Sequence, residues 1–312
     1  MPFKLKETDV AEHLKTEQQA MDVSSLEDRK LKEIEHSRVR RTILQGFERR
    51  SDTNKQEEAS DLGNMIRDHD AFEHHFSNAK FYAITHLSEK YQYGWLKERC
   101  KPGLNILDFA CGNGENGIYA AQCGANAVGI DISPEGVTNA NLNAEKLGVA
   151  DHCKFVVMDG ENMSFPDNAF DLGVEYGALH HVELDRAMSG LARVLKPEGE
   201  MICVEALRHN PIIHWYRRRT PHLRTEWEIE HILGVDQLEV LRKHFHEVNV
   251  KFFHLAALAA VPFRKTFLFK PLRTMLDMID RVILSNQVIG KYAWIMIVSI
   301  KNPRKGNRLT VK

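Results

Sequence analysis

Residues 104–205 alternate between short apolar segments and segments with helical periodicity, and this alternation limits the possible folds more than any other feature. We expect strands at the apolar segments 105–109, 127–130, 154–158, 170–174 and 200–205. Helical spacing is found at about 117–122, 137–147 and 184–195, and Lys196-Pro-Glu-Gly199 has the composition of a turn. Strands that alternate with helices build a mostly parallel sheet with helices on both faces, so we predict an α/β fold.

The N-terminal residues 1–70 differ from the rest because they are polar, charged and almost free of Gly and Pro. Val39, Ile43 and Phe47 are spaced four apart, which predicts one face of a helix. We therefore expect a helical N-terminal extension ahead of a main domain at 71–312. Its role stays open between a solvated segment, a lid, and a homodimerisation arm.

The segment that follows residue 206 predicts two additions to the sheet domain. Residues 237–244 are helical in pattern, 247–253 read as a strand, and 292–301 form a strong final strand. A helical insertion lies before that last strand, with apolar helical patterns at 256–261 and 272–284. We assign acceptor-site additions to 208–230 and 255–290, and we expect part of the aromatic segment 71–98 to reach the site.

Global composition excludes several classes of protein. The chain has a formal net charge of -1 and an isoelectric point near 7.0, which argues against a nucleic-acid partner. Its five cysteines lack C-x-x-C spacing, so we expect free thiols, a cytoplasmic location and no metal site. The N-terminus has no signal-peptide pattern, and no apolar run reaches the roughly 18 residues of a transmembrane segment.

An acidic residue follows each of the first three predicted strands. The first strand runs into Asp108-x-Ala110-x-Gly112-x-Gly114, where glycines let a ligand approach the backbone before a helix N-terminus. Asp131 follows the second strand, where a carboxylate can accept hydrogen bonds from ribose hydroxyls. Asp159 follows the third strand and is suited to accept from the amine of adenine. One such Asp is usually a cap or turn residue, whereas the set of three favours a nucleotide-like ligand.

These motifs resemble the class I S-adenosylmethionine (SAM)-dependent methyltransferase family. The resemblance covers about residues 75–205 and rests on ILDFACGNG (106–114), VGIDIS (128–133), MDGENMSFPDNAFDLG (158–173), EYGALHHV (175–182) and RVLKPEGEMICVE (193–205). It implies a Rossmann-like seven-stranded sheet whose last strand is antiparallel beside the fifth, a role that 292–301 fits. A dinucleotide dehydrogenase is the competing interpretation, but the loop lacks the G-x-G-x-x-G pattern.

The resemblance also implies which residues bind the cofactor. Ala110, Gly112 and Gly114 would line the methionine part of SAM, Asp131 would hold the ribose, and Asp159 the adenine. Asp108 would orient the loop. The full set that we expect to bind SAM, and the product S-adenosyl-L-homocysteine, is Asp108, Ala110, Cys111, Gly112, Gly114, Asp131, Ile132, Asp159, Gly160, Glu161 and Glu175.

The catalytic candidates are His180 and His181, which lie just beyond the fourth strand. Histidine titrates near neutral pH, so either side chain is suited to act as a general base. The commoner role for such a pair is to cap the following helix or to pack beneath it.

Residues 208–224, RHNPIIHWYRRRTPHLR, are the richest in arginine. Arginine suits phosphate or carboxylate groups, and aromatic rings add stacking faces. The expected acceptor-binding residues are Tyr82, His209, Trp215, Tyr216, Arg217, Arg218, Arg219 and Arg224. The alternative is a solvated helix face paired with Glu226, Glu228 and Glu230.

Arginines beside apolar helices suggest an amphiphilic, anionic small-molecule acceptor, for example an isoprenoid diphosphate methylated on carbon. O- or N-methylation of another metabolite stays open, as does a non-catalytic SAM-binding regulator. A nucleic-acid enzyme is disfavoured because Glu175-Tyr-Gly-Ala178 stands where amino-methylating enzymes carry an N/D-P-P-Y tetrad.

Overall fold

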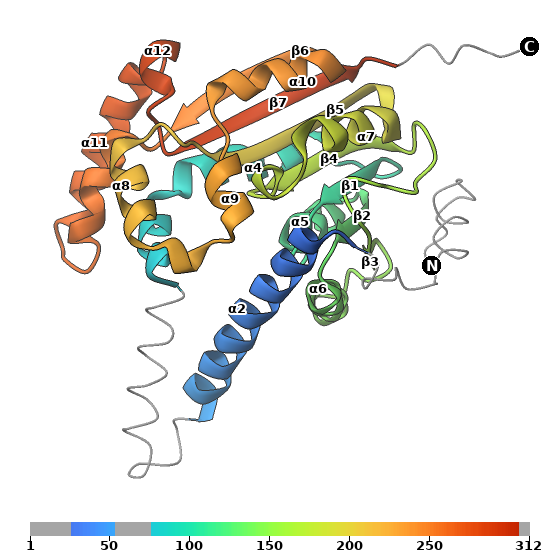
Figure 1. The fold of residues 1–312 in the computed structure, drawn as a ribbon, viewed down its shortest axis with the longest axis horizontal. Coiled ribbons are helices and arrows are strands. Elements are labelled where there is room, and N and C mark those ends of the chain that lie inside the picture. Colours follow the sequence, from blue (N-terminus) through green and yellow to red (C-terminus); the bar gives the residue numbers. More distant parts are fainter. Residues whose placement is uncertain (1–25, 54–75, 306–312) are drawn as a thin grey trace, which may run out of the picture.

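The computed structural model describes residues 26–53 and 76–305, without the side chains of 42–53, and centres them on a seven-stranded sheet. Its order is β3-β2-β1-β4-β5-β7-β6 (Figure 1). The strands are β1 Asn105–Phe109, β2 Asn126–Asp131, β3 Cys153–Val157, β4 Phe170–Tyr176, β5 Leu195–Ala206, β6 Phe245–Phe253 and β7 Ile295–Pro303. Neighbours among β1 to β5 pair in parallel, whereas β7 is antiparallel to both β5 and β6. This confirms the predicted α/β fold with its inserted antiparallel strand.

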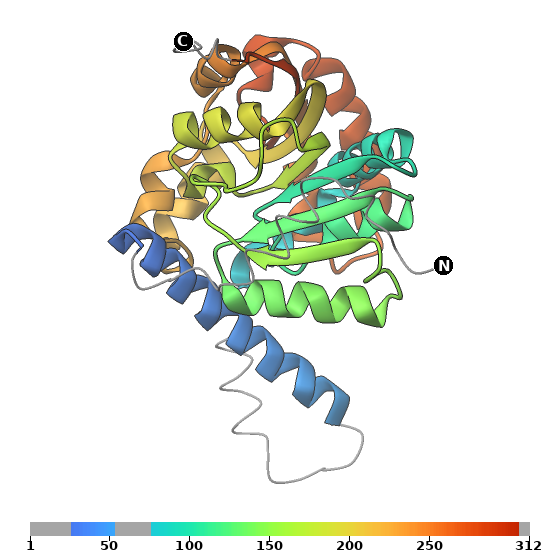
Figure 2. The same ribbon diagram turned by 90° about the vertical axis from the view of Figure 1, so that its right-hand side faces the viewer.

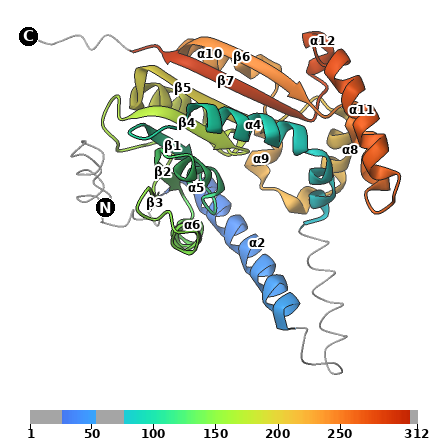
Figure 3. The same cartoon turned by 180° about the vertical axis from the view of Figure 1, so that it is seen from behind.

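Helices cover both faces of the sheet. The α-helices are α2 Asp28–Thr53, α4 His86–Arg99, α5 Glu115–Gln122, α6 Pro134–Lys146, α7 Leu184–Val194, α8 Pro211–Arg219, α9 Glu226–His231, α10 Leu238–His244, α11 Phe269–Ile283 and α12 Gln287–Gly290. Short 3-10 helices are η2 Ser77–Ile84, η3 Leu179–His181, η4 Pro221–Leu223, η5 Val235–Gln237 and η6 Ala256–Phe263. One apolar core joins the sheet to α4, α5 and α6, and a second joins it to α7 and α10 (Figures 1 and 3).

The loop between β1 and α5 has a backbone that few residues can adopt. Gly114 is the N-cap of α5 with φ 86°, and a Cβ there would lie 2.8 Å from the ring of Phe155. Only glycine avoids both the positive φ and this overlap. The loop therefore packs close to the sheet and leaves the start of α5 directed at the carboxyl end of β1.

The structure corrects one detail of the predicted elements. Lys196 to Gly199 do not separate a helix from a strand, because β5 already begins at Leu195, which is buried and pairs with Phe170. The next pair joins Leu172 to Glu200, so the intervening residues bulge from a continuous strand. The helical pattern at 256–261 forms a 3-10 helix, η6.

Helix α2, Asp28–Thr53, lies within the N-terminal extension. Val39 is 38% exposed, so its side chain does not enter a core. The side chains of Ile43 and Phe47, and all of residues 1–25 and 54–75, lie outside the described residues. Figure 2 shows α2 running past the end of the sheet next to α6. No helix in the described ranges is long and apolar enough to cross a membrane.

Candidate active site

A cavity of about 570 Å³ lies at the carboxyl ends of the parallel strands. Its walls come from the loops after β1 to β4, from the end of β5, from α2, η2, α8 and α9, and from the start of β7. Ligands of open α/β sheets bind at this end, because the connecting loops diverge there and leave a crevice. The cavity is therefore the candidate active site.

The predicted cofactor residues divide into a lining group and a supporting group. Those that line the cavity are Ala110, Asp131, Ile132, Asp159, Gly160 and Glu161. Those outside the lining are Asp108, Cys111, Gly112, Gly114 and Glu175. Sequence reasoning missed Asn113, Ser133 and Met158, which also line this end. They neighbour the motif residues, and that adjacency was the available signal.

Asp131 is fixed at the end of β2 by two backbone donors. Its Oδ2 accepts a hydrogen bond from Gly112 N at 2.9 Å, and its Oδ1 accepts one from Ser133 N at 2.8 Å. Burial raises the pKa of Asp131, although these two bonds lower it. The carboxylate thus ties the β1 loop to β2 while facing the cavity, the position that a ribose-binding acceptor needs.

Asp108 and Gly160 fix the backbone around the same end of the cavity. Asp108 Oδ2 accepts a hydrogen bond from Gly117 N at 2.8 Å, and burial raises the pKa of this carboxyl to about 8. At Gly160, a Cβ would lie 2.6 Å from the ring of Phe109. The loops after the first three strands therefore offer carboxylate acceptors and a backbone that a ligand can approach closely. Ribose and adenine need such groups, so these residues fit SAM.

Helix α2 contributes charged residues that the sequence did not single out. Lys30 Nζ lies 2.6 Å from Asp159 Oδ2 and 3.1 Å from Glu161 Oε2. Arg29 Nη2 lies 2.6 Å from the same Glu161 oxygen, and Arg41 donates to Asn113 Oδ1. These bonds hold α2 against the predicted adenine end. In a strongly charged segment, no pattern distinguishes Arg29 and Lys30 from solvated residues.

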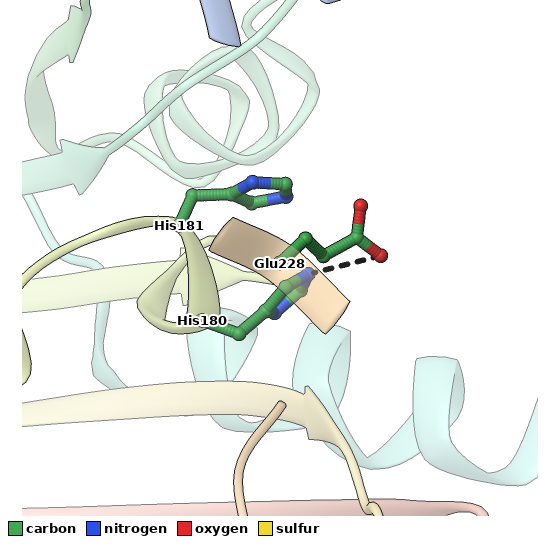
Figure 4. Close-up of side chains that lie close together, drawn as sticks. All are labelled: His180, His181 and Glu228. Carbon is green, nitrogen blue, oxygen red and sulfur yellow. Dashed lines mark ion pairs between the residues drawn. The ribbon is translucent and has the colours of Figure 1, made fainter. Parts of the chain in front are cut away.

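His180 and His181 lie in η3 and line the cavity (Figure 4). His180 Nδ1 is 2.7 Å from Glu205 Oε2, and its Nε2 is 3.9 Å from Glu228 Oε1. His181 Nδ1 is 2.9 Å from Glu33 Oε2 on α2. The alternative role as a helix cap is wrong, because the side chain of Glu183 caps α7.

Glu205 is half of a buried carboxyl pair with Glu175. Burial and the charge of Glu205 raise the pKa of Glu175 well above its usual range. Burial also acts to raise the pKa of Glu205, but His180 and the hydrogen bond with Glu175 lower it overall. Glu175 is therefore the protonated partner, and Glu205 is the carboxylate that accepts from His180 Nδ1. This arrangement directs His180 Nε2 toward Glu228 and the cavity.

His180, His181 and Glu228 also have the composition of a metal site. Within the described part of the chain, their donor atoms lie within 4.8 Å of one another. Glu228 Oε1 is already 3.1 Å from Arg224 Nε, so a guanidinium balances the carboxylate. The expectation of no metal stays a prediction.

The predicted acceptor residues also divide into two groups. Tyr82, Tyr216, Arg217 and Arg224 line the cavity, whereas His209, Trp215, Arg218 and Arg219 do not. The outer residues Trp215, Arg218 and Arg219 are exposed on α8, and the guanidinium of Arg219 lies 3.9 Å from the Trp215 ring. Helical periodicity explains the division, because positions 213, 216 and 217 share the inner face. Arg224 pairs with Glu228, as the alternative interpretation expected for part of the cluster.

Arg217 is the half-buried cation of the acceptor end. Burial and the neighbouring Arg224 lower the pKa of Arg217 to about 10. Its Nη1 donates to the Leu207 carbonyl at 2.8 Å, and no carboxylate of the described residues forms an ion pair with it. Beside it, Phe81 packs edge-to-face on Tyr216 at 4.9 Å and on Trp294 at 5.8 Å. Phe81 and Trp294 were missed because they lie outside the arginine-rich segment.

Comparison with known proteins gives one family for the central residues. Residues 107–203 match the methyltransferase domain family. The chain is 29% identical over 136 residues to sterol 4-C-methyltransferase of Caenorhabditis elegans, covering 43% of this chain and 40% of that protein. It is 34% identical over 117 residues to an uncharacterized methyltransferase of Synechocystis, covering 36% and 52%. The chain therefore spans about half or less of the length of these two relatives.

Two further proteins are similar to parts of this chain. A sterol 24-C-methyltransferase of Gibberella zeae is 40% identical over 101 residues, covering 32% of this chain and 27% of that protein. The solved geranyl diphosphate C-methyltransferase of Streptomyces coelicolor has a TM-score of 0.48 and 16% identity, over 70% of this chain and 81% of that one. The match and the order of the sheet together identify residues 107–203 as a methyltransferase domain of the class I, SAM-dependent type.

Proposed function

We propose that this protein transfers a methyl group from SAM to a small, amphiphilic, anionic acceptor. The observation that carries the proposal is the cavity, which joins Asp131 and Asp159 at one end to Arg217 and aromatic walls at the other. A methyltransferase has to bring a nucleotide and an acceptor together in this way, since positioning accounts for much of its rate enhancement.

SAM, when bound, supplies an electrophilic methyl group on a sulfonium. The residues of the chain hold and orient it in this proposal: Asp131 accepts from ribose hydroxyls, and Asp159 accepts from the adenine amine. Lys30 shares the Asp159 carboxylate, so α2 closes over the bound nucleotide. The ion pairs of α2 with the site favour this lid role over a homodimerisation arm.

His180 is the proposed general base. Glu205 holds its Nδ1 and thereby fixes the ring with Nε2 toward the cavity. His181 is less suited, because the hydrogen bond and charge of Glu33 outweigh burial and raise its pKa, which favours the protonated form. A base at His180 serves an oxygen or nitrogen acceptor during transfer, or removes the proton that carbon methylation leaves behind.

The acceptor end supports a ligand with an apolar body and one anionic group. Arg217 is half-buried and has no carboxylate partner among the described residues, and a partly desolvated guanidinium is costly unless an anion compensates it. An isoprenoid diphosphate methylated on carbon is one member of this class, and two of the relatives are named as sterol C-methyltransferases. An O- or N-methylated anionic metabolite is the alternative. The five unpaired cysteines are consistent with the cytoplasm as the proposed location.

The test is methyl transfer from isotopically labelled SAM to a panel of prenyl diphosphates, phenols, fatty acids and sugars. We expect turnover with an amphiphilic anion, and Arg217→Gln should raise its KM about tenfold or more. Arg218→Gln, one position along on the exposed face of α8, is the matched control and should leave KM unchanged. Equal effects of the two substitutions on KM would contradict an anion-binding role for Arg217. Absence of SAM binding by calorimetry would overturn the activity itself.

A further inference from the structure

Helix α11 presents an apolar stripe to solvent, whereas its two acidic residues lie toward the protein together with the buried Leu276. Met275, Met278, Ile279 and Val282 are exposed at i, i+3, i+4 and i+7 and so form one stripe. Asp277 and Asp280 are buried on the opposite side. A helix on a globular surface normally exposes polar residues, so this stripe needs a partner outside the described structure.

The apolar stripe continues beyond both ends of the helix. Phe267, just before α11, is 88% exposed, and Val288 of α12 is 70% exposed. Leu268 and Ile289 are exposed beside them. Figures 1 and 3 show α11 and α12 at the periphery of the molecule. We call the exposed side chains of residues 263–292 the outer surface.

Every charged side chain available to the outer surface is positive. Residues 255–293 contain six basic residues, Arg264, Lys265, Lys270, Arg273, Arg281 and Lys291, and two acidic ones. Both acidic side chains have partners inside the protein. Asp280 accepts from the backbone N–H groups of Leu255, Ala256 and Ala257, and Asp277 Oδ2 lies 3.3 Å from His86 Nε2. None of the six basic residues forms an ion pair with the described residues.

We infer that the outer surface docks this protein in the plane of an anionic lipid bilayer. Aromatic and aliphatic side chains on one side of a helix, with Lys and Arg as the only charged residues around them, are the features of an interfacial helix. Anionic headgroups would compensate the unpaired basic residues, and each Lys or Arg strengthens such binding. A second copy of this chain would place like charges against one another, which disfavours self-association through this surface.

The outer surface adjoins the acceptor end of the candidate active site. Helix η6 contacts both α11 and η2, and η2 carries Phe81 and Tyr82 of the cavity. A chain docked through α11 would therefore hold the aromatic wall of the cavity near the headgroup layer. The docking inference does not depend on the proposed methyl transfer, because vesicle binding requires neither SAM nor an acceptor.

Flotation of the full chain with lipid vesicles tests the inference. We expect the protein to float with phosphatidylcholine vesicles that contain phosphatidylglycerol, to stay behind with pure phosphatidylcholine, and to be released by high salt. Met278→Glu combined with Val282→Glu should weaken binding about tenfold or more, as should Lys265→Glu combined with Lys270→Glu.

The matched control is Leu142→Glu combined with Leu147→Glu, which changes two equally exposed apolar residues at α6. This control variant should bind vesicles as the unchanged protein does. Far-ultraviolet circular dichroism should show that the control and the variants of the outer surface are all folded. Failure of the unchanged protein to float with anionic vesicles would overturn the inference, as would unchanged flotation of the α11 variant. A dimer seen by light scattering that Met278→Glu and Val282→Glu abolish, without vesicle binding, would assign the surface to self-association instead.

Discussion

At the scale of single residues, the backbone of the β1 loop is held in an unusual conformation. Ala110 has φ 54°, in the left-handed region that non-glycine residues avoid, and it lines the cavity. Such strain persists only where the surroundings enforce it, and it concentrates at ligand sites. Here the hydrogen bonds that Gly112 and Ser133 donate to Asp131 hold one side of the β1 loop in this conformation. Asp108 holds the other side, because it accepts a hydrogen bond from the start of α5.

Asp131→Ala should weaken SAM binding about tenfold or more. The substitution removes the acceptor for ribose hydroxyls and leaves the N–H groups of Gly112 and Ser133 without their partner. Isothermal calorimetry measures the change in Kd. Asp151→Ala, at an exposed position before β3, is the control and should bind SAM normally. Normal binding by the Asp131 variant would show that the ribose lies elsewhere.

His180→Gln should lower kcat about a hundredfold or more while leaving the KM for SAM near its original value, because a general base acts in the transition state. His214→Gln, on an exposed position of α8, is the matched control. Steady-state kinetics with the acceptor found by the panel measure both constants. Full activity of the His180 variant would leave this histidine with a packing role only.

Asp108 should make the stability of the fold depend on pH. Burial raises its pKa from 3.8 to about 8, so within that window the unfolded chain releases a proton that the folded chain retains. The free energy of unfolding then falls by about 1.4 kcal/mol per pH unit as pH rises through the window. Asp108→Asn lacks this titration, so the stability of the unchanged protein relative to the variant should fall with rising pH in urea unfolding. Parallel pH profiles would contradict a raised pKa.

At the scale of elements, the sequence predicted most of what local periodicity and strand-end motifs encode. The order of strands and helices and the residues Asp131 and Asp159 follow from patterns within a few dozen residues. The site residues that the sequence did not single out depend on contacts between distant segments: Lys30 with Asp159, Glu33 with His181, and Trp294 with Phe81. The inner and outer faces of α8 became distinguishable only when its neighbours were placed.

Helix α2 should lose its hold on the site when Arg29 and Lys30 are both replaced by Met. Glu161, whose side chain is fully buried, would lose its two cations on α2, and Asp159 would lose Lys30. We expect faster hydrogen exchange of the α2 amides and about tenfold faster dissociation of S-adenosyl-L-homocysteine, since breaking a buried pair is strongly destabilising. Met at the exposed positions Lys32 and Arg38 is the control. Unchanged exchange would mean that other contacts hold the helix.

At the scale of the whole molecule, the sheet and its helices enclose most of the cysteines. Cys100, Cys111, Cys153 and Cys203 are buried, whereas Cys123 is partly exposed. Burial raises the pKa of Cys100 and Cys153 to about 12, and it also raises those of Cys111 and Cys203. Since the thiolate is the reactive form, these four should resist modification in the folded state.

A thiol reagent should therefore modify Cys123 alone in the native protein and all five cysteines after denaturation. Mass spectrometry of the labelled peptides identifies the sites. Early labelling of Cys111 would be the informative contradiction, because it would show that the β1 loop opens while the remaining core stays closed.

The position of β7 between β5 and β6 has a consequence for synthesis on the ribosome. β1 to β5 are consecutive in the chain and can pair as they emerge, but β6 finds its partner only when β7 has followed it. Until then the hydrogen-bonding edge of β5 stays open, and the cavity lacks Trp294 and Ile295. An unpaired edge of this kind invites aggregation, so a stalled nascent chain that has exposed β5 but not β7 is the form that most needs a chaperone.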